Sequence, residues 1–230
     1  MIIKKVQNKD QGSKLAAELF IEFSNASPSK PVGLATGETM AGVYRELSIQ
    51  GFSPAFEHAF ALDEYSGINK SDKNSYFQEL TENFSKLLNW HGRLHVPGHD
   101  EYSGDNLAEF DRAIQKHGPI SVQLLGLGTN GHVAFNEPGS EFDTTTREVE
   151  LHQETRLANS RFFESIDQVP THAKTQGLAT ISGADALLLL VFGESKLEAL
   201  KKASENPDES TPLAAITNHK NLVLITDLDI

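Results

Sequence analysis

The 230-residue sequence contains no cysteine, which excludes disulfides, thiolate catalysis and cysteine–zinc sites. It is also poor in basic residues, with 20 Lys and Arg against 32 Asp and Glu and a net charge of -12. Because the phosphate backbone of nucleic acids is bound by basic surfaces, we expect no nucleic-acid partner. The same imbalance means that an anionic ligand must be met by a few cations placed locally at its site.

Long apolar runs are missing as well. The longest run, Ala186–Phe192, is far shorter than the roughly 20 residues that a bilayer span requires. The first ten residues contain no apolar segment of the kind found in secretory signals. We therefore expect a cytoplasmic protein without a membrane partner. An apolar content of 38% and a charged content of 23% are typical of an ordinary globular protein, here predicted as one domain over residues 1–230.

Helix-like and strand-like patterns alternate along the chain. Apolar residues with helical spacing predict helices at 10–25, 39–47, 76–87, 104–117 and around 197–200. Short apolar runs predict strands at 31–35, 56–62, 94–96, 120–125, 177–182, 186–192 and 222–225. This alternation predicts an α/β fold with a doubly wound, mostly parallel, Rossmann-like sheet covered by helices on both faces. The aliphatic run 187–191 is typical of a strand buried on both faces.

A glycine-rich loop follows the predicted strand at 120–125. The segment Leu124–Pro138 combines three glycines with two amides, an imidazole and a carboxylate, among them Gly128, Asn130, Gly131, His132 and Glu137. Loops at strand ends of α/β sheets gather polar groups around ligands, and glycine lets the backbone approach a small molecule closely. The loop predicts a site for proton transfer, although from spacing alone a turn with a solvated histidine explains it equally well.

Two other predicted strands end in groups that can carry chemistry. The first runs into Thr36-Gly37-Glu38-Thr39 at the start of a helix, where free N–H groups and the helix dipole favour an anion. Such turns are common, so a purely structural turn is the simpler explanation from the residues alone. The second ends in Asp63, which precedes no clear helix and is therefore a better candidate for a base than for a helix cap.

The glycine-rich loop resembles the signature of the glucosamine-6-phosphate deaminases, also called isomerases. Further matches to this family lie at 36–39, 63–65, 155–163 and 169–177. With them, the resemblance extends over nearly the whole chain. The resemblance implies the conversion of glucosamine 6-phosphate and water to fructose 6-phosphate and ammonia, within amino-sugar metabolism and N-acetylglucosamine catabolism. It implies no metal and no organic cofactor.

The resemblance also assigns catalytic roles. Asp63 matches the base that moves a substrate proton from C2 to C1. His132 would carry the proton that opens the sugar ring, since the reference pKa of histidine, roughly 6.5, lies near working pH. Asn130 and Glu137 would orient the imidazole, and Glu64 and Tyr65 would orient their loop.

Substrate binding is implied for a second group of residues. The turn Thr36–Thr39 resembles the family's phosphate cradle, and Arg161 and Lys196 resemble its phosphate-binding cations. Without the resemblance, both cations would be interpreted as solvated helix-surface residues. The backbone amides between Gly128 and Gly131 are expected to bind sugar hydroxyls.

Departures from the family pattern leave alternatives open. Some members have Asp where this chain has Asn130, which leaves the pKa of ring opening undetermined. The sequence lacks a C-terminal segment of longer relatives, so both a monomer and a homo-oligomer are compatible with it. A 6-phosphogluconolactonase shares the fold, and a non-catalytic sugar-phosphate regulator would keep the phosphate ligands. Galactosamine 6-phosphate, a sugar epimer, is not excluded as substrate.

Some family members are activated by N-acetylglucosamine 6-phosphate through an arginine and a nearby lysine. Arg147 keeps the arginine, but Val149 stands in the place of the lysine, between Glu148 and Glu150. Because this charge pattern repels a phosphate, we expect no activation.

Three histidines, His91, His95 and His99, are spaced four residues apart, as metal ligands on one helix face would be. Glycines and a proline at 92, 97 and 98 interrupt any such helix, so no metal site is predicted. We expect His58 and His117 to be structural or solvated.

Overall fold

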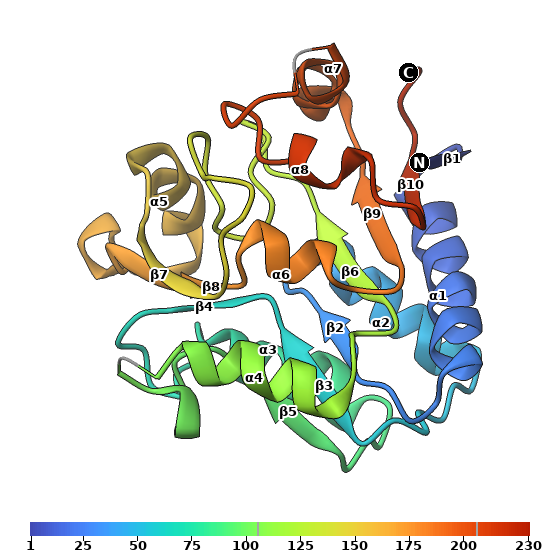
Figure 1. The fold of residues 1–230 in the computed structure, drawn as a ribbon, viewed down its shortest axis with the longest axis horizontal. Helices are drawn as coiled ribbons and strands as arrows, with labels where there is room; N and C mark the ends of the chain where they lie inside the picture. Colours follow the sequence, from blue (N-terminus) through green and yellow to red (C-terminus); the bar gives the residue numbers. More distant parts are fainter. Residues whose placement is uncertain (105, 206) are drawn as a thin grey trace.

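A computed structural model describes residues 1–104, 106–205 and 207–230. Its central feature is a sheet of seven parallel strands in the order β1-β10-β9-β6-β2-β3-β5 (Figure 1). The strands are β1 (Ile2–Lys5), β2 (Val32–Leu34), β3 (His58–Ala61), β5 (Arg93–His95), β6 (Gln123–Gly126), β9 (Leu187–Val191) and β10 (Leu222–Thr226). The prediction of a doubly wound α/β fold is confirmed.

Helices cover both faces of this sheet. In Figure 1, α4, α6 and α8 lie on one side, and α1 and α2 lie on the other. The helices are α1 (Lys9–Ala26), α2 (Glu38–Ile49), α3 (Tyr76–Leu80, continued by a π-helix over Thr81–Lys86), α4 (Ala108–His117), α5 (Gln153–Asn159), α6 (Leu178–Ser182), α7 (Leu197–Glu205) and α8 (Ala214–Thr217). Single 3₁₀ turns occur at Asp100–Tyr102, Ser160–Phe162, Ile166–Gln168 and Glu194–Lys196.

The core lies between the sheet and its two helical layers. All five residues of β9 are buried, as the uninterrupted aliphatic run predicts for a strand covered on both faces. On one face, Phe20 of α1 packs edge-on against Phe56, and on the other Phe110 of α4 packs edge-on against Phe60. Each buried aromatic ring of this size contributes a large apolar area to the hydrophobic stabilisation of the fold.

A second, three-stranded antiparallel sheet has the order β4-β8-β7. Its strands are β4 (Asp63–Tyr65), β7 (Arg147–Glu150) and β8 (His172–Thr175). The sequence pattern does not reveal them because they are short and mostly polar, and because pairing between distant segments stabilises them. They matter for the site, since β4 begins at Asp63, just beyond the end of β3.

The prediction of a strand at 177–182 is wrong. Leu178–Ser182 forms the short helix α6, in which the Ile181 N–H donates to the Gly177 carbonyl. Leu178 and Ile181, three residues apart, both bury their side chains. A run of only six residues fits both periods, so tertiary packing decided between them.

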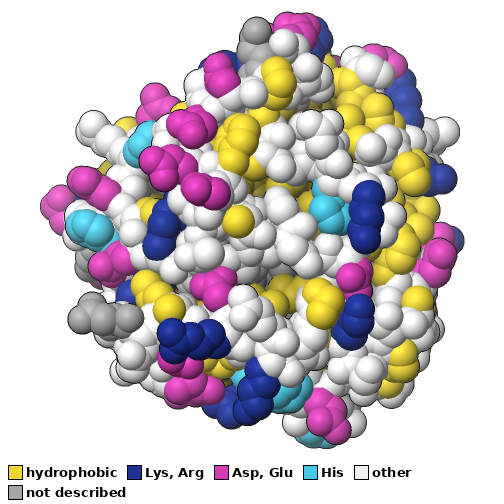
Figure 2. Space-filling model, in the orientation of Figure 1, with side chains coloured by type: hydrophobic (Ala, Val, Ile, Leu, Met, Phe, Trp, Pro, Cys, Tyr) yellow, Lys and Arg dark blue, Asp and Glu magenta, His cyan; other side chains and the backbone are white. Residues whose placement is uncertain are grey.

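Among the described residues, no helix is both long enough and apolar enough to cross a membrane. On the face shown in Figure 2, the Lys and Arg side chains do not merge into a continuous basic patch. Asp and Glu side chains are spread between them, in keeping with the net charge of -12.

Candidate active site

Four neighbouring parallel strands, in the order β9-β6-β2-β3, deliver their following loops to one edge of the sheet. The loop after β2 carries Thr36 and the loop after β6 carries His132. Asp63 follows β3, and Lys196 follows β9. The chain order reverses between β2 and β6, and this switch point is where open α/β sheets bind their ligands.

A cavity of about 410 Å³ lies at this edge. Seven of the predicted site residues line it: Thr36, Gly37, Asp63, Gly128, His132, Arg161 and Lys196. The arrangement brings a buried carboxylate, an imidazole and two cations to one small cavity. A carboxylate and an imidazole can transfer protons, and the two cations can hold an anionic group of the same ligand.

His132 is oriented by a chain of polar contacts behind the cavity wall. Its Nδ1 lies 2.6 Å from Asn130 Oδ1, and Asn130 Nδ2 donates to Glu137 Oε2 at 2.8 Å. An amide oxygen only accepts hydrogen bonds, so Nδ1 carries the proton and Nε2 keeps its lone pair. The Thr155 hydroxyl donates to the other oxygen of Glu137. Asn130 and Glu137 therefore lie behind the imidazole and do not line the cavity.

Two positions of this loop require glycine, each for a different physical reason. A side chain at Gly128 would collide with the His132 ring, since a Cβ there would lie 2.2 Å from it. Gly131 has φ +88, a conformation that residues with side chains rarely adopt. Gly128 thus lets the imidazole pack on the loop, whereas Gly131 turns the backbone outside the cavity lining.

Burial lowers the pKa of His132, and Lys196 and His152 lower it further. The Glu137 carboxylate, 3.7 Å from Nδ1, raises the pKa of His132, an effect second in size only to burial. The imidazole is therefore neutral at neutral pH, with Nε2 free to accept a proton.

Asp63 is only 8% exposed. Burial raises its pKa well above the ordinary value, and the nearby carboxylates Glu64 and Glu79 raise it further. The reference pKa of an aspartate in water, about 3.9, therefore does not describe this carboxyl. A carboxylate with a raised pKa is a stronger base, provided that the working pH leaves it ionised.

Glu64 has a structural part at the site. Its carboxylate accepts hydrogen bonds from the Tyr76 and Phe77 N–H groups at 3.1 and 3.0 Å, and from the Ser75 hydroxyl at 2.7 Å. These N–H groups begin helix α3, so Glu64 caps the helix and fixes Tyr76 in the cavity wall.

Helix α2 begins at the cavity without a side-chain cap. Thr36 and Gly37 line the cavity, but the Gly37 N–H donates to Glu79 Oε1 at 2.7 Å. Glu38 lines only an adjoining cavity of about 230 Å³, and its carboxylate lies 3.2 Å from Lys9. Thr39 lines neither cavity. The turn therefore supplies backbone groups and Thr36, not the side chains of residues 38 and 39.

The two predicted cations approach the cavity from separate elements. Lys196 ends the 3₁₀ turn after β9, and Arg161 lies in the 3₁₀ turn after α5. Burial lowers the pKa of Lys196, and the positive charge of Arg161 lowers it further. The repulsion between two cations this close costs free energy when no anion lies between them. Their proximity therefore favours a doubly charged ligand.

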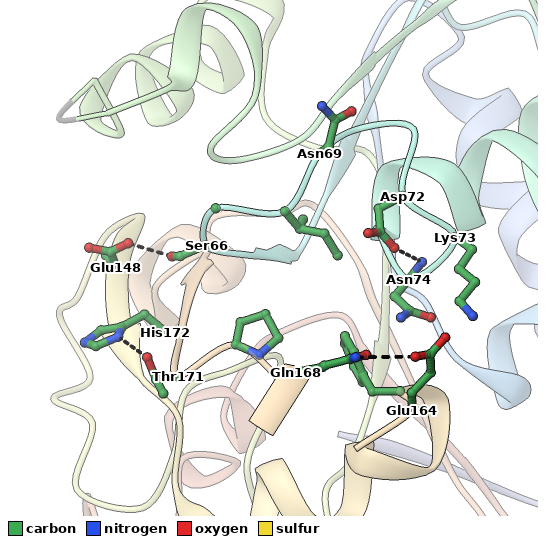
Figure 3. Close-up of a pocket in the computed structure, with 14 residues that line it drawn as sticks. Ser66, Asn69, Asp72, Lys73, Asn74, Glu148, Glu164, Gln168, Thr171 and His172 are labelled. Atoms are coloured by element: carbon green, nitrogen blue, oxygen red, sulfur yellow. Dashed lines mark hydrogen bonds between the residues drawn. The ribbon is translucent and has the colours of Figure 1, made fainter. Parts of the chain in front are cut away.

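A larger cavity, of about 930 Å³, lies elsewhere (Figure 3). Its lining includes Asp72, Glu148 and Glu164 but only one lysine, Lys73. Figure 3 shows the Ser66 hydroxyl directed at Glu148, and the donation is 2.6 Å long. Carboxylates in excess disfavour a phosphorylated ligand, so size alone does not identify the site.

Sequence reasoning missed several residues of the site. Tyr76, Thr129, Phe135 and Asn159 also line the cavity, and Glu79 lies behind it. Asn159 Nδ2 donates to the Tyr65 hydroxyl at 2.9 Å. Asn159 stands within the matched segment 155–163, which was the available signal. Nothing in the sequence pattern pointed to Glu79, because it belongs to a helix between two matched segments.

Known proteins resemble this chain over nearly its full length. Residues 9–225 match the family model of glucosamine-6-phosphate isomerases/6-phosphogluconolactonase. A glucosamine-6-phosphate deaminase of Corynebacterium urealyticum is 40% identical, covering 96% of this chain and 88% of the relative. One of Oceanobacillus iheyensis is 38% identical, covering 99% and 94%.

Solved structures show the same fold. A monomeric glucosamine-6-phosphate deaminase superposes with a TM-score of 0.90 at 33% identity, covering 98% of this chain and 97% of that one. A 6-phosphogluconolactonase of Shewanella baltica superposes with a TM-score of 0.77 at 14% identity, covering 98% and 97%. At that identity the second likeness concerns the fold alone.

Proposed function

The chain belongs to the family of glucosamine-6-phosphate isomerases and 6-phosphogluconolactonases, and we propose that it is an enzyme that converts glucosamine 6-phosphate and water to fructose 6-phosphate and ammonia. The observation that carries this proposal is one cavity holding Asp63, His132, Arg161 and Lys196. These groups supply a carbon base, a proton carrier and two phosphate ligands. Relatives 36–42% identical bear the name of this activity.

The first step opens the sugar ring. Nε2 of neutral His132 takes the proton of the O1 hydroxyl and delivers it to the ring oxygen as the C1–O5 bond breaks. The contact of Nδ1 with Asn130 Oδ1 selects this tautomer, and Glu137 holds the amide of Asn130 in turn. A histidine held from behind in this way can serve as base and then as acid.

The second step moves the double bond. Asp63 removes the C2 proton of the open aldehyde to form an enolamine and returns that proton to C1, while one proton of the C2 amine passes to O1. The resulting C2 imine is hydrolysed: water adds to C2, the C2–N bond breaks to release ammonia, and the C2 carbonyl of fructose 6-phosphate remains. A buried carboxylate with a raised pKa suits the removal of a weakly acidic carbon proton.

Phosphate binding holds the substrate for both steps. Arg161 and Lys196 meet the phosphate charges, and Thr36 with the uncapped start of α2 adds hydrogen-bond donors. The backbone of Gly128 and Thr129, which line the cavity, faces the sugar. The cost of holding two cations in one cavity is offset when the phosphate binds between them.

The alternative activity, hydrolysis of 6-phosphogluconolactone, needs no base for a carbon proton and gives Asp63 no task. A purely regulatory protein would likewise not need Asp63 and His132 in the same cavity as the phosphate ligands. The test is ammonia release from glucosamine 6-phosphate, measured beside hydrolysis of the lactone. Lactone hydrolysis without ammonia release would reverse the assignment. Galactosamine 6-phosphate in the same assay establishes which epimer is preferred.

Asn130→Asp would test the tautomer and charge of His132. A carboxylate in place of the amide, 2.6 Å from Nδ1, stabilises the imidazolium, so the pKa of His132 should rise by about one unit or more. Titration of the His132 ring signals by NMR measures this directly. Asn25→Asp, on the exposed face of α1, adds the same charge and should leave that pKa unchanged. An unchanged pKa in Asn130→Asp would rule out the direct contact.

Regulation by N-acetylglucosamine 6-phosphate is expected to be absent. Arg147 donates to Asn136 Oδ1 at 2.8 Å and to Ser140 Oγ at 3.3 Å, so its guanidinium already has internal partners. Glu148 and Glu150 add negative charge beside it. We therefore predict hyperbolic rate curves that the effector does not change. Sigmoidal curves that become hyperbolic on adding it would contradict this.

The proposal extends to the oligomeric state, the domain organisation and the cellular context of the enzyme. We propose a monomer, supported by the likeness to a monomeric deaminase, and light scattering on the purified protein measures its mass. Residues 1–230 would act as one domain, which a single cooperative unfolding transition would support. We also assign the enzyme to the hydrolase class, to N-acetylglucosamine catabolism and to the cytoplasm, and cell fractionation tests the last of these.

A further inference from the structure

Three histidines from separate parts of the sequence converge on the far side of β3 from α1. His58 begins β3, His95 ends the edge strand β5, and His117 ends α4. Their nearest ring nitrogens all lie within 4.8 Å of one another, and His58 Nδ1 is 2.9 Å from His95 Nε2. None of the three lines the candidate active-site cavity.

We propose that His58, His95 and His117 form a binding site for one transition-metal ion of the zinc class. Three imidazole nitrogens are a common ligand set for Zn²⁺, with water in the fourth position of the tetrahedron. Ligand nitrogens 2.0–2.1 Å from a tetrahedral Zn²⁺ lie about 3.3 Å apart. His58 Nδ1 and His95 Nε2, 2.9 Å apart, are already near this separation. The His117 ring stacks on that of His58 with centroids 3.7 Å apart, and it would turn at the end of its helix to direct a nitrogen at the same ion.

The surroundings of His95 match those of a metal ligand. Its Nδ1 lies 2.6 Å from the Tyr102 hydroxyl, which can accept the Nδ1–H and leave Nε2 with its lone pair toward the other two rings. Metal-bound histidines commonly have such a partner on the second nitrogen. The ring is 3% exposed and stacks on Phe60 at 4.3 Å, so its position is fixed.

Charge and protonation are compatible with a cation. Neutral imidazole is the form that binds metal. Arg93 and Lys116 repel a cation, but Arg93 is paired with Glu101, and Glu57 lies beside His58.

The position of the site indicates a structural role. A bound ion would join the end of α4 to the paired strands β3 and β5, which α4 otherwise meets through side-chain packing. His58 also lines a surface hollow of about 550 Å³, formed by residues 53–58 and 89–93, which gives an ion access from solvent. This inference revises the expectation of no metal site: His95 takes part, but with His58 and His117 in place of His91 and His99.

The test uses untagged, chelator-treated full-length protein with Zn²⁺, and Co²⁺ as a visible probe of tetrahedral geometry. We expect one Zn²⁺ per chain and a rise in Tm of roughly 5–10 °C at a hundredfold excess over Kd. His58→Gln and His117→Gln should lose the binding and the rise in Tm, whereas the exposed control His91→Gln should keep both.

Circular dichroism of each metal-free variant checks that it is folded, and His117, at the end of its helix, is the replacement least disruptive to the fold. Absence of stoichiometric binding to the parent protein would overturn the proposal. Equal binding by all three variants would also overturn it, because the ion would then be held elsewhere. Ammonia release is a separate readout, so failure of the proposed function leaves this test intact.

Discussion

The Asp63→Asn variant should lose at least about 100-fold in turnover with glucosamine 6-phosphate, the lower end of the effect of a general base. The amide keeps the shape of the side chain but cannot accept the C2 proton. Substrate affinity should change little, because the phosphate is held by Arg161 and Lys196. Steady-state ammonia release gives kcat and KM separately.

A matched control is Asp167→Asn, which removes the same charge from an exposed turn and should leave the rate unchanged. Near-normal turnover in Asp63→Asn would remove Asp63 from the mechanism. Exchange of the C2 proton with solvent deuterium provides a second readout. It should stop in Asp63→Asn even if ring opening, which depends on His132, continues.

The pH dependence of kcat/KM in the parent enzyme should reflect the pKa of Asp63. The base acts only when deprotonated, and its pKa is raised, so kcat/KM should fall on the acid side at a higher pH than for an ordinary carboxylate. Because the charge of Glu79 helps to raise that pKa, Glu79→Gln should move the acid limb to lower pH. A limb that stays in place or moves upward would contradict the assignment.

Arg161→Ala should weaken binding of phosphorylated sugars by roughly 2 kcal/mol, or about 30-fold, as for a lost charge-assisted hydrogen bond. Lys196 would then face the phosphate alone. The measurement is competitive inhibition by the product fructose 6-phosphate, compared with fructose. Only the phosphorylated sugar should lose affinity, because the guanidinium is assigned to the phosphate.

Lys201→Ala serves as the control for net charge. Lys201 lies on α7 outside the cavity, with its ammonium 3.9 Å from Glu198, and its removal changes the charge of the chain equally. Its fructose 6-phosphate affinity should stay near that of the parent. If Arg161→Ala kept the same preference for phosphate as the parent, Arg161 would not be a phosphate ligand.

The local pattern of apolar residues was sufficient to predict most strands of the central sheet. The aliphatic run of β9 and the four-residue spacing of α1 each fix their own structure, because burial on two faces or on one helical stripe leaves a distinct period. The run at 177–182 was too short to distinguish a helical period from a strand period. The strands of the second sheet also escaped prediction, since pairing between residues far apart in sequence gives them their stability.

For the active site, the sequence by itself determined the chemical groups and the loops that carry them. Asp63, His132 and Lys196 each follow a strand, and parallel strands bring their carboxyl ends to one edge. Only the tertiary structure decided their state. The raised pKa of Asp63 and the lowered pKa of His132 arise mainly from burial, which depends on every element packed around them.

The same division explains the three histidines. The spacing of His91, His95 and His99 was visible in the sequence, but the chain there does not form the single helix that would align them. His58, His95 and His117 have no spacing in common, yet two neighbouring strands and the end of a helix bring them together. Local sequence determined which segments form strands and helices, while packing decided which distant side chains became neighbours, because contacts between separate elements leave no period in the sequence.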